Sequence, residues 1–117
     1  MDFGLKGKVA LVAASSRGLG RAIAHELAAE GADLVLCARG EAALEEARQA
    51  IALETGRRVV AVTADLSRPG DAERVVNAGL DEFGRIDILV TNAGGPPSGP
   101  FESHSPQAWR DAVRLTL

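Results

Sequence analysis

The sequence of 117 residues contains no tyrosine and a single cysteine. One cysteine, Cys37, excludes a disulfide within the chain and supports no zinc cluster. Thirteen basic side chains stand against sixteen acidic ones, and no basic stripe of the kind that binds nucleic acid is present. No apolar run is long enough to cross a membrane, and the start, MDFGLKGKV, lacks the apolar core of a signal peptide. These absences predict a cytoplasmic protein without a membrane, nucleic-acid or metal partner.

Apolar runs and helical patterns alternate along the chain. The apolar runs are short and rich in β-branched residues, which predicts strands that are buried on both faces. The predicted strands cover residues 9–14, 33–38, 58–64 and 86–92. The predicted helices run from Leu19 to Gly31, over 41–55, from Pro69 to Gly84 and from Ser105 onward.

Apolar residues one turn apart predict the face of each helix that packs on the sheet. The predicted faces are Leu19, Ile23 and Leu27 in the first helix, with Ala24 and Ala28 beside them, Leu44, Ala47 and Ile51 in the second, and Val76, Leu80 and Phe83 in the third. Alternating strands and helices with short connections predict one α/β domain over residues 1–117, with a doubly wound parallel sheet and helices on both faces.

The segment VAASSRGLGRAI joins the first strand to the first helix through a glycine-rich turn. This order places backbone N–H groups and the positive end of a helix dipole at the carboxyl end of a strand, a geometry that binds phosphate. Gly18 and Gly20 leave room for the backbone to approach a pyrophosphate, and Ser15 and Ser16 can add hydroxyl donors. The strict G-x-G-x-x-G spacing is not met, because Ile23 stands in place of its third glycine, so a purely structural turn is the alternative.

Asp65-Leu66 follows the third predicted strand and Asn92-Ala93-Gly94 follows the fourth. Together with the glycine-rich turn, these motifs resemble, in register, those of the short-chain dehydrogenases/reductases. The T-G-x-x-x-G-x-G turn of that family corresponds to residues 13–20, with Ala13 and Ala14 in place of its threonine and first glycine. Its Asp-Leu motif is present as Asp65-Leu66 after the third strand, and its N-A-G motif as Asn92-Ala93-Gly94 after the fourth. The resemblance covers the whole chain and implies a Rossmann-type fold that binds a nicotinamide dinucleotide.

The resemblance also implies roles for the last two motifs. Asp65 would face the adenine ring, and Asn92 and Gly94 would line the cofactor near its nicotinamide. The alternatives are that Asp65 stabilises a loop and that Asn92-Ala93-Gly94 is only a tight turn. Ala14 departs from the family pattern, and we expect it to adopt a negative φ, at which alanine is tolerated.

Two arginines bear on the choice of cofactor. NAD sites usually place an acidic residue about twenty positions beyond the glycines, where it binds the ribose 2′-hydroxyl. Here that position holds Ala38, followed by Arg39, and Arg17 precedes the glycine at 18. Because a guanidinium matches a phosphate, NADP is the predicted cofactor, with NAD as the alternative if both arginines are ordinary surface residues.

The residues predicted to bind the cofactor are Ala14, Ser15, Ser16, Arg17, Gly18, Leu19, Gly20, Ala38, Arg39, Asp65, Leu66, Asn92, Ala93 and Gly94.

No catalytic residue is predicted within the chain. The family uses a serine, a tyrosine and a lysine, the last two spaced Y-x-x-x-K, because an acid must protonate the oxyanion formed by hydride transfer. The chain has no tyrosine, and Thr116 occupies the position of an asparagine that often joins them. We therefore expect the chain to be the cofactor-binding half of a longer enzyme, truncated before the catalytic segment and inactive alone.

The predicted function is that of an NADP-dependent oxidoreductase, which transfers hydride between NADPH and a carbonyl or alcohol substrate, of which the 3-oxoacyl type is one candidate. The alternative is a nucleotide-binding or interaction module without catalysis. The fourth strand is apolar yet would be an edge in the order 3-2-1-4, so we expect another chain or further residues to cover it. The resemblance implies a homo-oligomer.

Overall fold

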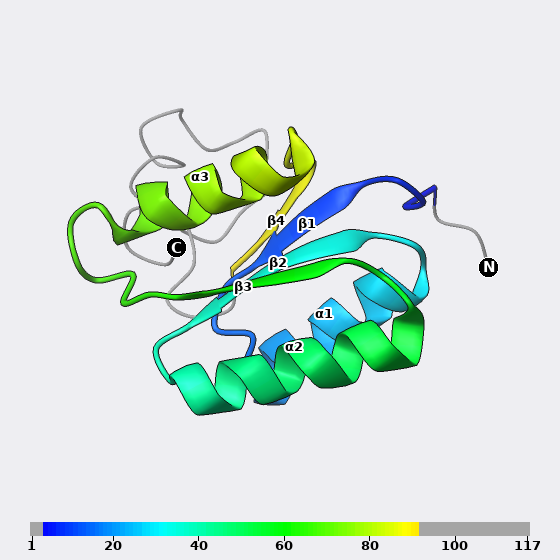
Figure 1. Cartoon of the computed structure of the whole chain (residues 1–117), viewed down its shortest axis with the longest axis horizontal. Helices are drawn as coiled ribbons and strands as arrows, with labels where there is room; N and C mark the ends of the chain where they lie inside the picture. The colour runs from blue at the N-terminus through cyan, green and yellow to red at the C-terminus, as the bar shows by residue number, and fades with distance from the viewer. Residues whose placement is uncertain (1–3, 92–117) are drawn as a thin grey trace, which may run out of the picture.

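The computed structural model describes residues 4–91, which form a parallel sheet between two layers of helices (Figure 1). The sheet has four strands in the order β3-β2-β1-β4. They are β1 (Val9–Val12), β2 (Asp33–Ala38), β3 (Val59–Thr63) and β4 (Ile88–Val90). The helices are α1 (Gly18–Ala29), α2 (Glu41–Thr55) and α3 (Asp71–Phe83). Helices α1 and α2 cover one face of the sheet and α3 covers the other, which confirms the predicted α/β fold and strand order.

The strands are aligned so that their carboxyl ends meet at one edge of the sheet. Val12 pairs with Leu36 of β2 and with Val90 of β4, and Ala38 pairs with Thr63 of β3. In parallel sheets of this kind, ligands bind outside the carboxyl ends of the strands. The connections after β1, β2 and β3 leave from this edge, and every described residue of the predicted cofactor site lies on or beside it.

Two apolar clusters, one on each face of the sheet, hold the layers together. Alternate residues of β1 and β2 point to opposite faces, as the two-residue period of a strand requires. Ala10 and Leu34 belong to the cluster under α1 and α2, whereas Leu11 and Val35 belong to the cluster under α3. All four are fully buried. Because these strands bury side chains on both faces, they read as continuous apolar runs in the sequence.

The structure corrects the predicted buried faces of α1 and α3. Helix α1 buries Gly20 together with Ala24 and Ala28, which were predicted beside its apolar face, whereas Leu19 is 68% exposed. Helix α3 buries Val75 and Gly79. Small residues at these contacts let the helix axes approach the sheet closely, so the larger neighbours stand at the sides of the contact, where Ile23, Leu27, Val76 and Phe83 are half-buried and Leu80 is 42% exposed. The predicted face of α2, Leu44, Ala47 and Ile51, is confirmed.

Three strands and helix α3 are shorter than predicted, and α1 begins one residue before its predicted start and ends two residues before its predicted end. Strand β1 ends at Val12, because the chain turns out of the sheet two residues later. Helix α3 begins at Asp71 and not at Pro69, because Gly70 adopts a left-handed φ of 88° that interrupts the helix. Strands β3 and β4 cover the central part of the predicted segments. The last predicted helix, from Ser105, lies outside the described residues.

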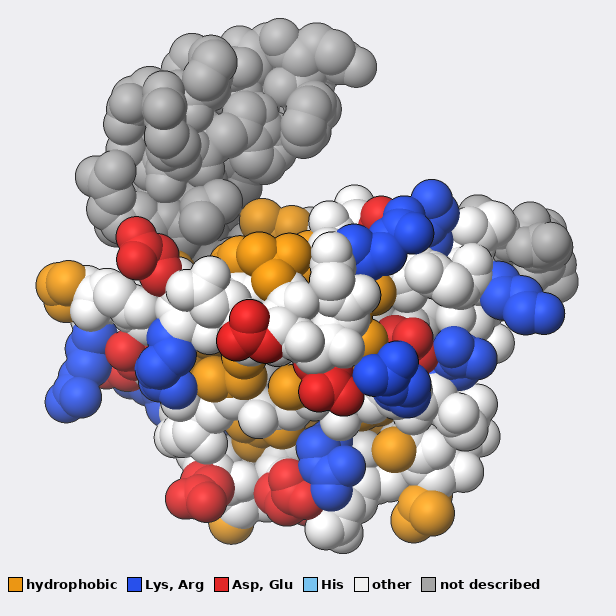
Figure 2. Space-filling view, turned by 45° about the horizontal axis from the view of Figure 1, so that its top comes forward, with side chains coloured by type: hydrophobic (Ala, Val, Ile, Leu, Met, Phe, Trp, Pro, Cys, Tyr) orange, Lys and Arg blue, Asp and Glu red, His pale blue; other side chains and the backbone are white. Residues whose placement is uncertain are grey.

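One face of the described surface carries charged side chains of both signs (Figure 2). Figure 2 shows Lys and Arg side chains intermixed with Asp and Glu across one face, without a continuous stripe of either sign. Among residues 4–91, no helix is long and apolar enough to cross a membrane. Leu89 of β4, the outer strand on its side of the described sheet, is 41% exposed. That another chain or further residues cover this strand stays a prediction.

The contact between α3 and the sheet predicts the effect of Gly79→Ala. A Cβ at this position would lie 2.8 Å from Cγ2 of the buried Val35 and 3.2 Å from Cδ1 of Ile86. Val35 is stiff and tightly packed, so we expect the substitution to lower the free energy of unfolding by about 1–3 kcal/mol, although alanine favours helix more than glycine does. Chemical denaturation measures this, with Asn77→Ala on the exposed side of α3 as the control. A more stable Gly79→Ala protein would contradict this packing.

Candidate cofactor-binding site

The turn after β1 changes the side of the sheet to which the backbone bonds. The N–H of Ala13 donates to the carbonyl of Val90 in β4 at 2.9 Å, whereas the N–H of Ser15 donates to the carbonyl of Cys37 in β2 at 3.1 Å. In an extended chain both N–H groups would point to the same neighbour. Ala14 makes the change with a φ of +52°. The prediction of a negative φ is therefore wrong, because the reversal between two strands requires a left-handed residue here.

Ser15 ties this turn to β2 with its side chain as well. Its hydroxyl is fully buried, accepts the N–H of Cys37 at 3.1 Å and donates to the carbonyl of Cys37 at 3.3 Å. The prediction that this hydroxyl donates to a ligand is therefore wrong, because the hydroxyl already donates to and accepts from the backbone of Cys37. Ser15 holds the turn in place. Ser16, the next residue, lines a hollow beside the turn.

A hollow of about 430 Å³ lies between the turn after β1 and the segments that follow β2 and β3. Its volume lies in the range of small-molecule sites. The predicted site residues that line it are Ala14, Ser16, Arg17, Ala38, Arg39, Asp65 and Leu66. Cys37, Gly40, Ala64 and Ser67 also line it and were not predicted. Ser67 had a sequence signal, because a serine two residues after an aspartate commonly bonds to that carboxylate.

Helix α1 begins directly after the lining residue Arg17 and has an uncapped N-terminus. Arg17 is its N-cap, and no side chain there bonds to the free N–H groups of the first turn. The first turn of α1 also contains no acidic residue, whereas α2 has Glu41 and α3 has Asp71 in that position. The predicted residues Gly18, Leu19 and Gly20 form this first turn. The end of the helix therefore offers N–H donors and a positive dipole without a competing carboxylate.

Asp65 brings a fixed negative charge to the opposite side of the hollow. Its Oδ1 accepts the hydroxyl of Ser67 at 2.6 Å and the N–H of Ser67 at 3.0 Å. The Ser67 hydroxyl and then its N–H hold the pKa of the Asp65 carboxyl below its usual value, with smaller help from the charges of Arg39 and Arg68. Asp65 is thus an ionised group that only accepts hydrogen bonds at neutral pH.

Cys37 lies at the base of the hollow without the properties of a nucleophile. Burial raises the pKa of its thiol to about 11, so the thiol stays protonated at neutral pH. Within the part of the chain from residue 4 to 91, no three His, Cys, Asp or Glu side chains are grouped to hold a metal ion. The predicted residues Asn92, Ala93, Gly94 and Thr116 lie outside the described residues. The described residues of the hollow thus offer the N–H groups of α1 and the guanidinium groups of Arg17 and Arg39 as donors.

A parallel sheet with an uncapped helix and two arginines at its carboxyl edge defines a nucleotide-binding fold of the α/β class. The sequence model of the family described as short chain dehydrogenase matches residues 8–117. The chain belongs to this family of oxidoreductases, which confirms the resemblance.

Three proteins illustrate the similarity. The 3-oxoacyl-(acyl-carrier-protein) reductase FabG of Escherichia coli is 37% identical over 96% of this chain and 44% of its own length. The structure of L-sorbose reductase from Gluconobacter frateurii with NADPH and L-sorbose is 38% identical, with a TM-score of 0.80 over 98% of this chain and 47% of that one. A short chain dehydrogenase/reductase from Burkholderia phymatum in complex with NAD is 29% identical, with a TM-score of 0.75 over 97% of this chain and 42% of that one. The chain thus spans less than half the length of each.

The left-handed Ala14 predicts the effect of removing its Cβ. A left-handed conformation costs an alanine about 1–2 kcal/mol, whereas glycine adopts it freely but loses more entropy on folding. We expect Ala14→Gly to leave the free energy of unfolding unchanged or to raise it by about 1 kcal/mol, without weakening the binding of NADPH. Ala14→Val, which places a β-branched residue at the same φ, should be clearly destabilising. Denaturation and fluorescence titration measure both effects, and a loss of stability in Ala14→Gly would contradict the assigned backbone.

Proposed function

We propose that this chain provides the NADP(H)-binding part of an oxidoreductase that interconverts a carbonyl and an alcohol. Membership of the family supports the oxidoreductase class, and the residues around the hollow support the cofactor. The bound dinucleotide would supply or accept the hydride. The work of the described residues is to hold it in one orientation.

The pyrophosphate of the dinucleotide would bind at the N-terminus of α1. The free N–H groups of the first turn and the helix dipole stabilise an anion placed there. Gly18 leaves the approach to these N–H groups open. A Cβ at this position would project into space that holds no protein atom within 4 Å, and a ligand can use that space. The turn itself is held by Ser15, so these donors need little rearrangement when the ligand arrives.

The choice of NADP(H) over NAD(H) depends on Arg17 and Arg39. Both line the hollow, one from the turn after β1 and the other from the end of β2. Ala38, the last residue of β2, has no carboxylate that could bind a ribose hydroxyl or repel a phosphate. A charge-assisted hydrogen bond contributes about 1.5–3 kcal/mol, so each arginine can favour the 2′-phosphate by about tenfold or more. This pair of arginines is the observation that carries the proposal.

The adenine would lie beyond the ribose, towards the end of β3, between Leu66 and the carboxylate of Asp65. Leu66 is half-buried and packs against the cluster under α3, so it offers a fixed apolar surface to a ring. Asp65 offers an acceptor. The NADPH in the structure of L-sorbose reductase supports this choice of ligand, and the NAD in that from B. phymatum keeps NAD as the alternative.

No group that transfers a proton to the substrate is assigned among residues 4–91. The 117 residues contain no tyrosine, so the acid that the family uses at the substrate oxygen would have to come from elsewhere in the protein. A 3-oxoacyl substrate, for which FabG is the supporting relative, stays a prediction, as do the homo-oligomer, the cytoplasmic location and the inactivity of this segment alone. A nucleotide-binding module without catalysis is the alternative, and oxidation of NADPH by a carbonyl compound would exclude it.

Arg39→Ala tests the phosphate contact. We expect the Kd for NADPH to rise by about ten- to a hundredfold, because one charge-assisted contact is lost, while the Kd for NADH stays within about twofold. Calorimetric titration of the purified protein with each dinucleotide measures both constants. Arg58→Ala is the matched control, because Arg58 is exposed and precedes β3 at the opposite edge of the sheet, where it pairs with Glu82. Equal losses for both dinucleotides in Arg39→Ala would refute recognition of the 2′-phosphate.

A further inference from the structure

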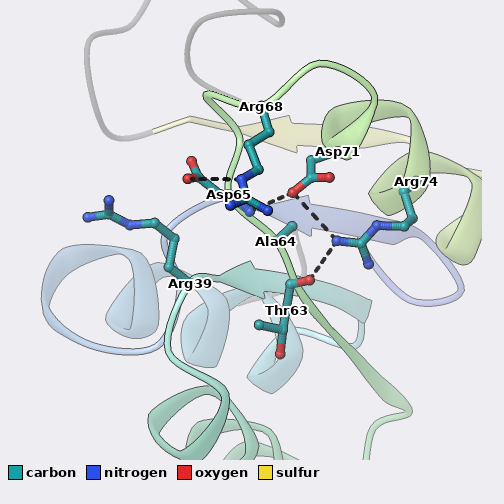
Figure 3. A pocket seen from close by; sticks show the side chains of 7 residues that line it. All are labelled: Arg39, Thr63, Ala64, Asp65, Arg68, Asp71 and Arg74. Carbon is teal, nitrogen blue, oxygen red and sulfur yellow. Dashed lines mark hydrogen bonds and ion pairs between the residues drawn. The ribbon is translucent and has the colours of Figure 1, made fainter.

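A second hollow, of about 290 Å³, lies beside the cofactor hollow and shares Arg39, Ala64 and Asp65 with it. Figure 3 shows this second hollow, which is completed by Thr63, Arg68, Asp71 and Arg74. Asp71 comes from the first turn of α3, so this group links that helix to the segment that carries Asp65. Nothing in the proposed binding of the phosphates uses Asp71.

Asp71 holds the backbone of Asp65. Its Oδ2 accepts the N–H of Asp65 at 2.8 Å, and the side chain of Asp71 is only 20% exposed. Arg74 supports the same oxygen from the next turn of α3, at 3.6 Å, and donates to the carbonyl of Thr63 at 2.8 Å. Figure 3 shows these contacts converging on the chain between Thr63 and Asp65. The end of β3 is therefore attached to α3 on both sides of Ala64.

The side chain of Asp65 is held separately, by Ser67. Both hydrogen bonds from Ser67 go to Oδ1. Oδ2 faces Nε of Arg68 at 3.9 Å, which is longer than a hydrogen bond. With its backbone set by Asp71 and its rotation set by Ser67, Asp65 presents Oδ2 as an acceptor in a fixed direction. Arg39, Arg68 and Arg74 line the same hollow and offset the repulsion between the two carboxylates.

We propose that Asp71 is a positioning residue that orients Asp65 to accept a hydrogen bond from the 6-amino group of the cofactor's adenine. This inference rests on the proposed function, because it requires the adenosine to lie along the edge from β2 to β3. The amino group of adenine donates to a carboxylate, whereas the 6-oxo group of hypoxanthine is an acceptor and is repelled by it. Asp71 therefore determines how well the site distinguishes the two bases.

The experiment compares two ligands whose bases differ at the 6-position, where an amino donor is replaced by an oxo acceptor and the neighbouring N1 gains a proton. The ligands are NADPH and reduced nicotinamide hypoxanthine dinucleotide phosphate, titrated by calorimetry into the wild-type protein, Asp71→Ala and Asp71→Asn. Wild type should prefer NADPH. Asp71→Ala should weaken the binding of NADPH by about five- to tenfold, since the hydrogen bond to the ionised Asp65 is misaligned and part of its strength is lost, and should change the binding of the hypoxanthine ligand by less than about twofold. Asp71→Asn keeps an oxygen that can accept the N–H of Asp65 and should retain the preference of wild type.

Glu73→Ala is the matched control, because it removes a second carboxylate from the same turn of α3 at an exposed position. It should leave both affinities unchanged. Equal losses for both ligands in Asp71→Ala, no loss for either, or the same loss of preference in Asp71→Asn would overturn the role of Asp71. Equal binding of the two bases by wild type would overturn it without any variant. Wild-type protein that binds neither ligand would instead overturn the proposed function and this inference with it.

Discussion

The hydrogen bonds between Ser15 and the backbone of Cys37 are the contact on which the rest of the site depends. They join the turn after β1 to the end of β2 and thereby bring Arg17 and Arg39 to one hollow. The contact is possible only because Ala14 turns the chain from β4 towards β2. It is fully buried, so a protein without this hydroxyl would leave the N–H of Cys37 unsatisfied, at a cost of about 1–3 kcal/mol.

The arrangement divides the binding of one elongated anion among three strand ends. The N-terminus of α1 can hold the central phosphates, the arginines after β1 and β2 can hold a third phosphate, and the segment after β3 can hold the base. Each segment is fixed by contacts within the protein, namely Ser15 with Cys37 and Asp65 with Asp71. A site prepared in this way loses little conformational entropy when its ligand binds. The first turns of α1 and α3 differ accordingly. The first turn of α1 lacks acidic residues where phosphate would bind, whereas that of α3 carries Asp71, which accepts the N–H of Asp65.

Much of the fold could be predicted because its signals are local. Strand β2 and helix α2 were predicted with the bounds that the structure has, since the run of five apolar residues after Asp33 and an apolar stripe of Leu44, Ala47 and Ile51 are unambiguous. The failures concern contacts between distant segments. The φ of Ala14 depends on where β4 and β2 lie, and the burial of the Ser15 hydroxyl depends on Cys37, 22 residues away. Helix α1 buries Gly20, which carries no hydrophobic signal, next to the predicted Ala24 and Ala28, whereas Leu19, with the stronger signal, is exposed. Asp71 reads as an ordinary first-turn acid until its contact with Asp65 is seen.

We propose that residues 4–91 form the adenosine half of an NADP(H) site. The most direct measurement uses ligands that contain only this half, so that nothing depends on the residues that would meet the nicotinamide or the substrate. Purified protein is titrated by calorimetry with 2′,5′-ADP and with 5′-AMP, which lacks the 2′-phosphate. We expect 2′,5′-ADP to bind at least about tenfold more tightly than 5′-AMP, because the extra phosphate meets Arg17 and Arg39. Equal affinities for the two ligands, or no heat with either, would contradict it.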